Sequence, residues 1–120
     1  MAELINSDDN LLRRVVFQNP SFVRPDQTLT SFAFTPRKIA GGAEKLSVDI
    51  ERLTTHAKSI RDRYTYRLYA LTAEQVRQIG LDCEHDPLPD NEAHALIVGT
   101  VTNSKAKQLA AFARRVPFPD

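Results

Sequence analysis

The sequence predicts a single α+β domain, with a mixed but mostly antiparallel sheet of about five strands and two or three helices packed on it. Several segments alternate apolar and polar residues with the period of two that is typical of a strand. In the second half of the chain, shorter segments with helix signals lie between the strands. At 120 residues the chain is long enough to bury one core. Strands that come first and then alternate with helices favour a sheet covered by helices on one side.

The first half of the chain holds three of the expected strands. Residues 1–10 are polar and acidic, and we expect a flexible lead-in to a single domain that spans residues 11–120. Residues 11–17 and 45–50 are rich in β-branched and apolar side chains, which favours strands. Residues 28–35 alternate cleanly, and a strand there would place Phe32 and Phe34 on the same side.

A basic, glycine-containing segment follows at residues 37–42. Neighbouring glycines after Lys and Arg are compatible with a phosphate-binding loop, but the segment lacks the spacing of either common phosphate-loop motif. We therefore interpret it as a surface loop. Between residues 51 and 63, Leu53, Ala57 and Ile60 recur at helical spacing, which predicts a helix with its basic residues near the end.

Residues 64–84 carry the clearest local signals. Residues 64–71 alternate as a strand, and residues 73–79 are predicted to form a short helix. Thr72 and Gln75 have the spacing of a capping box, and Gly80 stands where a left-handed residue ends a helix. A further short strand is expected at residues 81–84.

The last part of the chain predicts one more strand and a closing helix. Residues 96–101 form an apolar run that Gly99 interrupts, as at a bulge. We expect the final helix to start at a cap formed by Asn103 and to end with Arg114 and Arg115 in its last turn.

Composition excludes several classes of partner. The formal net charge of +1 provides no global attraction to nucleic acid or to a membrane surface. The single cysteine, Cys83, excludes an intramolecular disulfide, and its apolar surroundings favour a small core residue. The start of the chain lacks the pattern of a signal peptide, and no apolar run approaches transmembrane length. We expect a soluble, cytoplasmic protein.

Candidate functional residues gather in the polar loop between residues 84 and 94. His94 is the candidate acid–base residue because small neighbours leave its ring room, although a structural hydrogen bond is the alternative. Asp86, Asp90 and Glu92 are candidate ligand-binding or orienting carboxylates, although this composition also suits a surface turn. The spacing matches no known metal motif, so no metal or other cofactor is predicted.

Two residues outside this loop complete the predicted set. Arg14 and Ser31 lie on expected early strands, from which they could hold an anionic substrate such as a nucleotide phosphate.

Three stretches together resemble a pattern found in short uncharacterised bacterial proteins. They are residues 31–36 (SFAFTP), residues 45–48 (KLSV), and the loop from Asp86-Pro87 to Ala93-His94-Ala95. The resemblance spans about residues 11–113. It implies a compact bacterial domain, and it transfers no functional residue.

Three functional hypotheses follow. The sequence favours a non-enzymatic interaction or accessory domain that binds a larger protein or itself, through a sheet edge or the 85–94 loop. The alternative is a small enzyme or ligand-binding domain that uses His94 and its neighbouring carboxylates on an anionic molecule. A second alternative is weak binding of single-stranded nucleic acid by the strand around Tyr64, Tyr66 and Tyr69, which the balanced charge disfavours.

Overall fold

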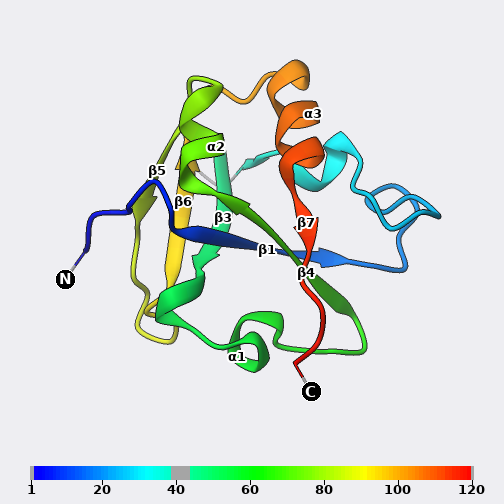
Figure 1. Ribbon diagram of the computed structural model, residues 1–120, viewed down its shortest axis with the longest axis horizontal. Coiled ribbons are helices and arrows are strands. Elements are labelled where there is room, and N and C mark those ends of the chain that lie inside the picture. The colour runs from blue at the N-terminus through cyan, green and yellow to red at the C-terminus, as the bar shows by residue number, and fades with distance from the viewer. Residues whose placement is uncertain (1, 39–43, 120) are drawn as a thin grey trace.

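The computed structural model describes residues 2–38 and 44–119, and these residues form the predicted α+β fold (Figure 1). Six described strands lie in the order β5-β6-β3-β1-β4-β7, and β2 pairs with β3 beside this row. Every pair of described strands is antiparallel. The strands are β1 (Asn10–Val16), β2 (Arg37–Lys38), β3 (Glu44–Ile50), β4 (Tyr66–Thr72), β5 (Asp82–His85), β6 (His94–Val98) and β7 (Arg114–Arg115).

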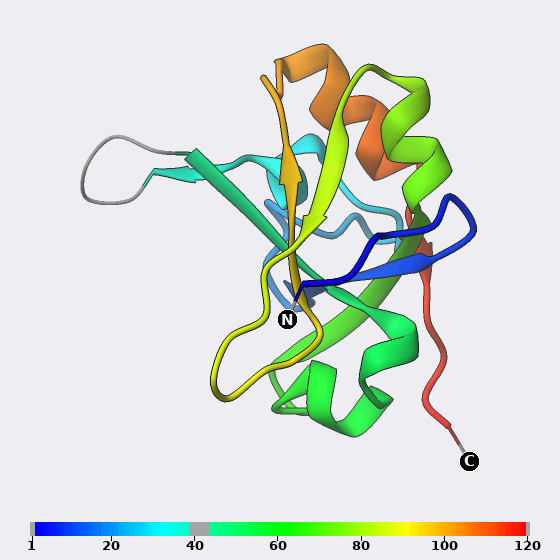
Figure 2. The ribbon, with the colours of Figure 1, turned by 90° about the vertical axis from the view of Figure 1, so that its left-hand side faces the viewer.

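Helices cover both faces of the sheet, so the expectation of a single covered face was wrong. Figure 2 shows α2 (Ala73–Gln78) and α3 (Asn103–Phe112) at one end of the molecule and α1 (His56–Ile60) at the other. Two 3-10 turns, η1 (Ser31–Phe34) and η2 (Glu51–Leu53), complete the described helical segments. Of these described segments, none is long and apolar enough to pass through a bilayer.

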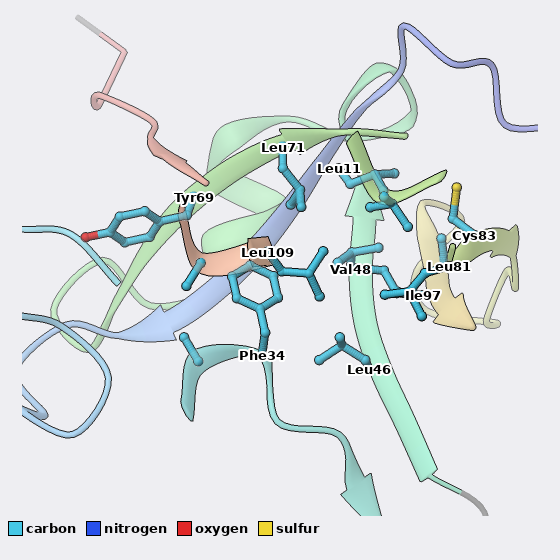
Figure 3. Close-up of a cluster of buried hydrophobic side chains, with 14 of the residues drawn as sticks. Leu11, Phe34, Leu46, Val48, Tyr69, Leu71, Leu81, Cys83, Ile97 and Leu109 are labelled. Carbon is cyan, nitrogen blue, oxygen red and sulfur yellow. The ribbon is translucent and has the colours of Figure 1, made fainter. Parts of the chain in front are cut away.

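The main core lies between the sheet and the layer formed by α2, α3 and η1 (Figure 3). Leu11, Phe34, Leu71 and Leu109 are completely buried there. A smaller cluster on the opposite face packs α1 against the sheet through Leu12, Ile60, Leu68 and Ala70. Cys83 belongs to the main core, which confirms its prediction as a buried residue.

The segment from β4 to β5 confirms its predicted signals in detail. The Thr72 side chain accepts from the Gln75 backbone N–H, and the Gln75 side chain accepts from the Thr72 N–H, which completes the capping box. Gly80 has a φ of 83°, and its N–H donates to the Arg77 carbonyl while the Leu81 N–H donates to the Val76 carbonyl. This is a Schellman closure, in which a left-handed residue satisfies the last carbonyls of a helix.

The prediction of a strand at residues 28–35 was wrong. Leu29 makes only an isolated bridge with Val23, and residues 31–34 form the 3-10 turn η1. Residues two apart point in different directions in such a turn, so Phe34 is fully buried while Phe32 is 62% exposed. Packing of η1 on α3 therefore overrides the alternating pattern.

Two predicted helices differ from the structure at their ends. Residues 51–63 form η2 and the short α1, which Thr55 caps by accepting from the Lys58 N–H. For α3 the cap is Thr102, which accepts from the Lys105 N–H, and Asn103 is the first helical residue. The helix ends at Phe112 because Arg114 and Arg115 leave it to pair with Ala70 and Tyr69 as β7.

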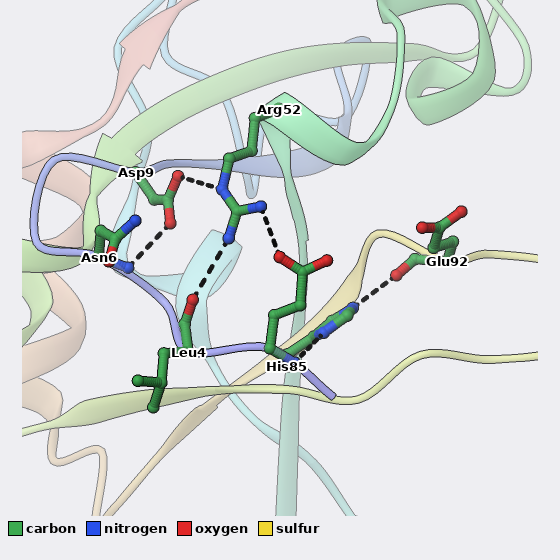
Figure 4. Close-up of polar contacts among 7 residues, drawn as sticks. Leu4, Asn6, Asp9, Arg52, His85 and Glu92 are labelled. Carbon is green, nitrogen blue, oxygen red and sulfur yellow. Dashed lines mark hydrogen bonds and ion pairs between the residues drawn. The ribbon is translucent and has the colours of Figure 1, made fainter. Parts of the chain in front are cut away.

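The two segments that we expected to be loops lie differently with respect to the described structure. Residues 37 and 38 form β2, and the rest of the predicted 37–42 loop lies outside the described residues. The flexibility expected of residues 1–10 stays a prediction, but Ile5 is buried and Asp9 pairs with Arg52 at 2.9 Å (Figure 4).

Candidate functional site

The most distinctive feature of the sheet is an opening between β1 and β3. On one edge, β1 pairs with β4 along its whole length, from Asn10–Thr72 to Val16–Tyr66. On its other edge, the described register pairs with β3 are only Leu11–Ile50 and Leu12–Asp49. Beyond Leu12 the two strands separate, and the ladder that would place Arg14 opposite Ser47 does not form.

Arg13 spans this opening with its side chain. Its Nε–H donates to the Ala33 carbonyl at 2.9 Å, and a terminal N–H donates to the Ser47 carbonyl at 2.8 Å. The guanidinium also lies 5.9 Å from the centre of the Phe34 ring. One side chain therefore links β1, η1 and β3 where the backbone ladder has stopped.

A groove of about 800 Å³ occupies the opening. This volume is within the range usual for sites that hold small organic ligands. Two arginines and several hydroxyl groups contribute to its walls, and no Asp or Glu of the described residues does so. The lining residues are Arg13, Arg14, Val15, Val16, Ser21, Phe22, Phe32, Ala33, Thr35, Ser47 and Tyr66.

Arg14 is a partly buried cation of this groove. It donates to the Ser59 carbonyl at 2.9 Å and lies 5.3 Å from the centre of the Tyr66 ring, and it has no ion pair within the described chain. Burial lowers the pKa of Arg14, and Arg61 lowers it further, whereas Asp49 acts in the opposite direction. The Asp49 carboxylate is bound by the Ser59 hydroxyl and the Asn91 amide. Because a guanidinium stays charged in proteins, Arg14 brings positive charge to the groove.

Backbone groups from both walls also face the groove. The Phe17 N–H donates to Thr65, so the odd residues of β1 bond to β4 and the even ones point toward β3. The Ile50 N–H donates to Ala93, so Ser47 likewise points its N–H and carbonyl toward β1. Its carbonyl accepts from Arg13, as this alternation requires. The groove therefore combines N–H donors with the two guanidinium groups.

His94 connects the predicted loop to the groove. It begins β6, where it faces Asp49 across the strand pair, and its side chain is 15% exposed. Its Nδ1 lies 2.9 Å from the Asp86 carbonyl oxygen and 3.3 Å from the Asp86 carboxylate. Its Nε2 lies 3.2 Å from the hydroxyl oxygen of Ser47, which lines the groove.

The second histidine of the loop has structural contacts. The Nδ1 of His85 accepts from the Glu3 N–H at 2.8 Å, and its Nε2 lies 2.6 Å from the Glu92 carbonyl (Figure 4). A carbonyl oxygen only accepts, so Nε2 carries the proton and Nδ1 is free to accept. His85 thus links the N-terminal segment to the loop.

The other predicted residues lie apart from His94. Asp90 and Glu92 line a second cleft of about 470 Å³ with Lys58 and Arg61, between α1 and the loop. Ser31 is the first residue of η1, beside the groove residue Phe32 but not in the groove lining. The structure thus brings Asp86 to His94, and it places Arg14 in the groove.

The tyrosine strand does not present its rings as one platform. Tyr69 is 1% exposed, and its hydroxyl donates to the Gln27 carbonyl, whereas Tyr64 is 81% exposed. Arg67 lies between the rings of Phe17 and Phe118, 3.8 Å and 4.7 Å from their centres. Binding of nucleic acid by this strand stays a prediction.

The sequence interpretation missed Arg13, Phe32 and Ser47 as groove residues. The polar Ser47 and Asp49 alternate with the apolar residues of β3, which indicated a polar face. The contact between Ser47 and His94 joins residues 47 positions apart, and it depends on the register of β3 with β6. No local pattern specifies that register.

Comparison of the chain with protein-family models, with curated proteins and with solved structures yields no match. No group of three or more His, Cys, Asp and Glu side chains among the described residues is arranged to hold a metal ion.

Proposed function

We propose that this protein is a binding domain for an anionic organic ligand, which it holds in the groove between β1 and β3. The supporting observation is the charge of the groove. Arg13 and Arg14 contribute to its lining, and no acidic residue of the described chain does. A positive, partly buried group without a protein counter-ion favours an anion from solution, because the attraction is stronger where water is partly excluded.

The remaining lining residues indicate a ligand with an apolar, flat portion. Phe32 is 62% exposed at the groove although large aromatic side chains usually gain stability from burial. Tyr66 presents a second ring next to Arg14. Hydroxyl groups of Ser21, Thr35 and Ser47 supply neutral hydrogen-bonding partners. A nucleotide-like molecule, with an anionic group and an aromatic ring, fits this combination.

A calorimetric titration with AMP and with adenosine tests the proposal. The two probes share the base and sugar, so the difference between them reports the contribution of the phosphate. We expect AMP to bind more tightly than adenosine. Arg14→Gln should weaken AMP binding about tenfold, since a charge-assisted hydrogen bond contributes on the order of 1.5–3 kcal/mol. Gln retains a donor for the Ser59 carbonyl, which limits the structural effect of the change.

Arg114→Gln is the matched control, because it removes the same charge from an exposed position of β7. Equal loss of AMP affinity in both variants would show that only the net charge matters, and it would refute the groove as the binding site. Equal affinities of the wild type for AMP and adenosine would refute the anionic class of ligand. Circular dichroism of each variant confirms that the fold is retained.

A second candidate occupant of the groove is an extended segment of a protein partner. The even residues Arg14 and Val16 point their backbone groups away from β4, and neither has a register partner in β3 among the described residues. An added strand could bond to this edge, as in other proteins that bind peptides by extending a sheet.

A photo-crosslinking amino acid at position 32 tests this second candidate. It should crosslink to a partner or to a second copy of the chain, whereas the same group at position 4 should not. Leu4 is a suitable control because it is 89% exposed and lies outside the groove. Equal crosslinking from both positions would count against a partner bound in the groove.

A further inference from the structure

We propose that Ser47 is a nucleophile that hydrolyses an ester of the anionic molecule bound in the groove, with His94 as its general base and Asp86 as a positioning residue. The inference rests on the proposed function, because the groove that would bind the anion is also the one that Ser47 lines. The three residues come from β3, β6 and the loop after β5.

The hydrogen bonds of His94 determine which nitrogen acts as the base. Its Nδ1 lies 2.9 Å from the Asp86 carbonyl, which only accepts, so Nδ1 carries the proton of the neutral ring. Nε2 therefore has a free electron pair, and the Ser47 hydroxyl, 3.2 Å away, donates to it. This is the tautomer that a base needs to remove the proton of a serine hydroxyl.

Asp86 is placed to hold the ring and to stabilise its charged form. Its carboxylate lies 3.3 Å from Nδ1, on the side opposite the nitrogen that contacts Ser47. The Asp86 N–H donates to the His94 carbonyl at 2.9 Å, so the backbone fixes the spacing of the two residues. A nucleophile, a base and an orienting carboxylate in this order form the recurring arrangement of serine-based acyl transfer.

The groove also offers donors for a developing oxyanion. The backbone N–H of Ser47 points toward the groove, by the alternation of β3 with β6. The guanidinium of Arg13 holds the Ser47 carbonyl at the same wall. Donors already in place around a developing negative charge stabilise the transition state.

The reaction balances with water as the second substrate. The Ser47 oxygen attacks the ester carbonyl carbon and forms a C–O bond, while its proton moves to His94 Nε2. The tetrahedral intermediate breaks its bond to the alcohol oxygen, which takes the proton from Nε2 and leaves. A water molecule then attacks the acyl group on Ser47, passes its proton to Nε2, and releases the acid as Ser47 regains the proton.

A fluorophosphonate probe tests the nucleophile in the unaltered protein. Its phosphorus bonds only to an activated serine oxygen as fluoride leaves, so labelling requires no variant to fold. We expect mass spectrometry to locate the label on Ser47. The exposed Ser104 of α3 is the internal control. Absence of label, or labelling of Ser47 no faster than of Ser104, would refute the inference.

Turnover is measured with 4-acetoxybenzoate, whose carboxylate supplies the anion, and with its neutral methyl ester. Wild-type protein should release 4-hydroxybenzoate and prefer the anionic ester. Ser47→Ala and His94→Gln should lower kcat by roughly 100-fold to 10,000-fold, the range that acid–base groups contribute. Asp86→Asn should lower kcat by about tenfold or more with little change in KM. Ser104→Ala should leave turnover unchanged.

Calorimetry with 4-acetoxybenzoate and the Ser47→Ala protein separates binding from catalysis. Binding by this variant without hydrolysis would support both the groove and the nucleophile. If wild-type protein binds the ester but neither hydrolyses it nor reacts with the fluorophosphonate, the nucleophile is refuted and the binding function stands. If Ser47 is labelled but no anionic probe binds, the proposed binding function is refuted and the activated serine stands.

Discussion

The two edges of β1 differ in both pairing and chemistry. Along β4 the ladder is complete, and the buried Leu68 and Leu71 support it by packing on opposite faces of the sheet. Along β3 the ladder stops after Leu12, where Arg13 and Arg14 begin the walls of the groove. Apolar neighbours on both faces favour continued pairing, whereas the charged residues remain solvated in an opening. One strand thus supports the core on one edge and a candidate binding site on the other.

The largest effect should come from the closed edge. Leu71→Ala removes a completely buried side chain from the main core, so we expect the free energy of unfolding to fall by about 2–5 kcal/mol. Urea denaturation followed by circular dichroism measures it. Leu4→Ala, at an 89% exposed position, should change it by less than about 0.5 kcal/mol. Similar losses in both variants would contradict this description of the core.

Arg13→Gln should have the next largest effect, because the shorter side chain no longer joins the Ala33 and Ser47 carbonyls. We expect a loss of about 1–3 kcal/mol in the free energy of unfolding. Lys107→Gln removes a charge from an exposed position of α3 and is the control. Equal stability of the two variants would show that Arg13 does not hold the opening together.

Tyr69→Phe probes the residue that pairs with Arg13 on the closed edge. Loss of the hydrogen bond to the Gln27 carbonyl should cost about 1 kcal/mol near neutral pH. Burial raises the pKa of Tyr69, although Arg115 and Arg67 oppose the shift. The folded state then retains the proton longer than the unfolded state, whose tyrosine ionises near about pH 10, so stability falls as pH rises through that range.

Unfolding of wild type and Tyr69→Phe at about pH 8 and about pH 10.5 measures this linkage. The difference in stability between the two proteins should shrink at the higher pH, because only the wild type loses the contribution of Tyr69. A difference that stays constant or grows would contradict the direction of the pKa shift.

The smallest effect on stability should come from the open edge. Phe32→Ala should change the free energy of unfolding by less than about 0.5 kcal/mol, since the ring is 62% exposed. It should nevertheless weaken binding of AMP in the calorimetric titration. Phe34→Ala, two residues away and fully buried, should cost about 3–5 kcal/mol. Phe32→Ala with undiminished AMP affinity would exclude the ring from the binding surface.

Local sequence determined the elements whose signals lie within a few residues. Thr72, Gln75 and Gly80 specify the start and end of α2, because capping and left-handed closure involve neighbouring backbone groups. The alternating segments at β1, β3 and β4 were predicted for the same reason. Residues 28–35 show the limit of such patterns, since packing on α3 gave η1 a different conformation from the one that alternation indicated.

The candidate site could be predicted from the sequence only in parts. Arg14, Asp86 and His94 were chosen for their chemistry, and Asp86 and His94 lie within one loop connection. Ser47 had to be brought to His94 by strand register, and the groove exists because a ladder stops after two residue pairs. Register and separation depend on long-range packing of whole strands, which a local sequence pattern does not encode. The sequence by itself thus determined the α+β class and the chemistry of single residues, and the tertiary structure decided which of them meet.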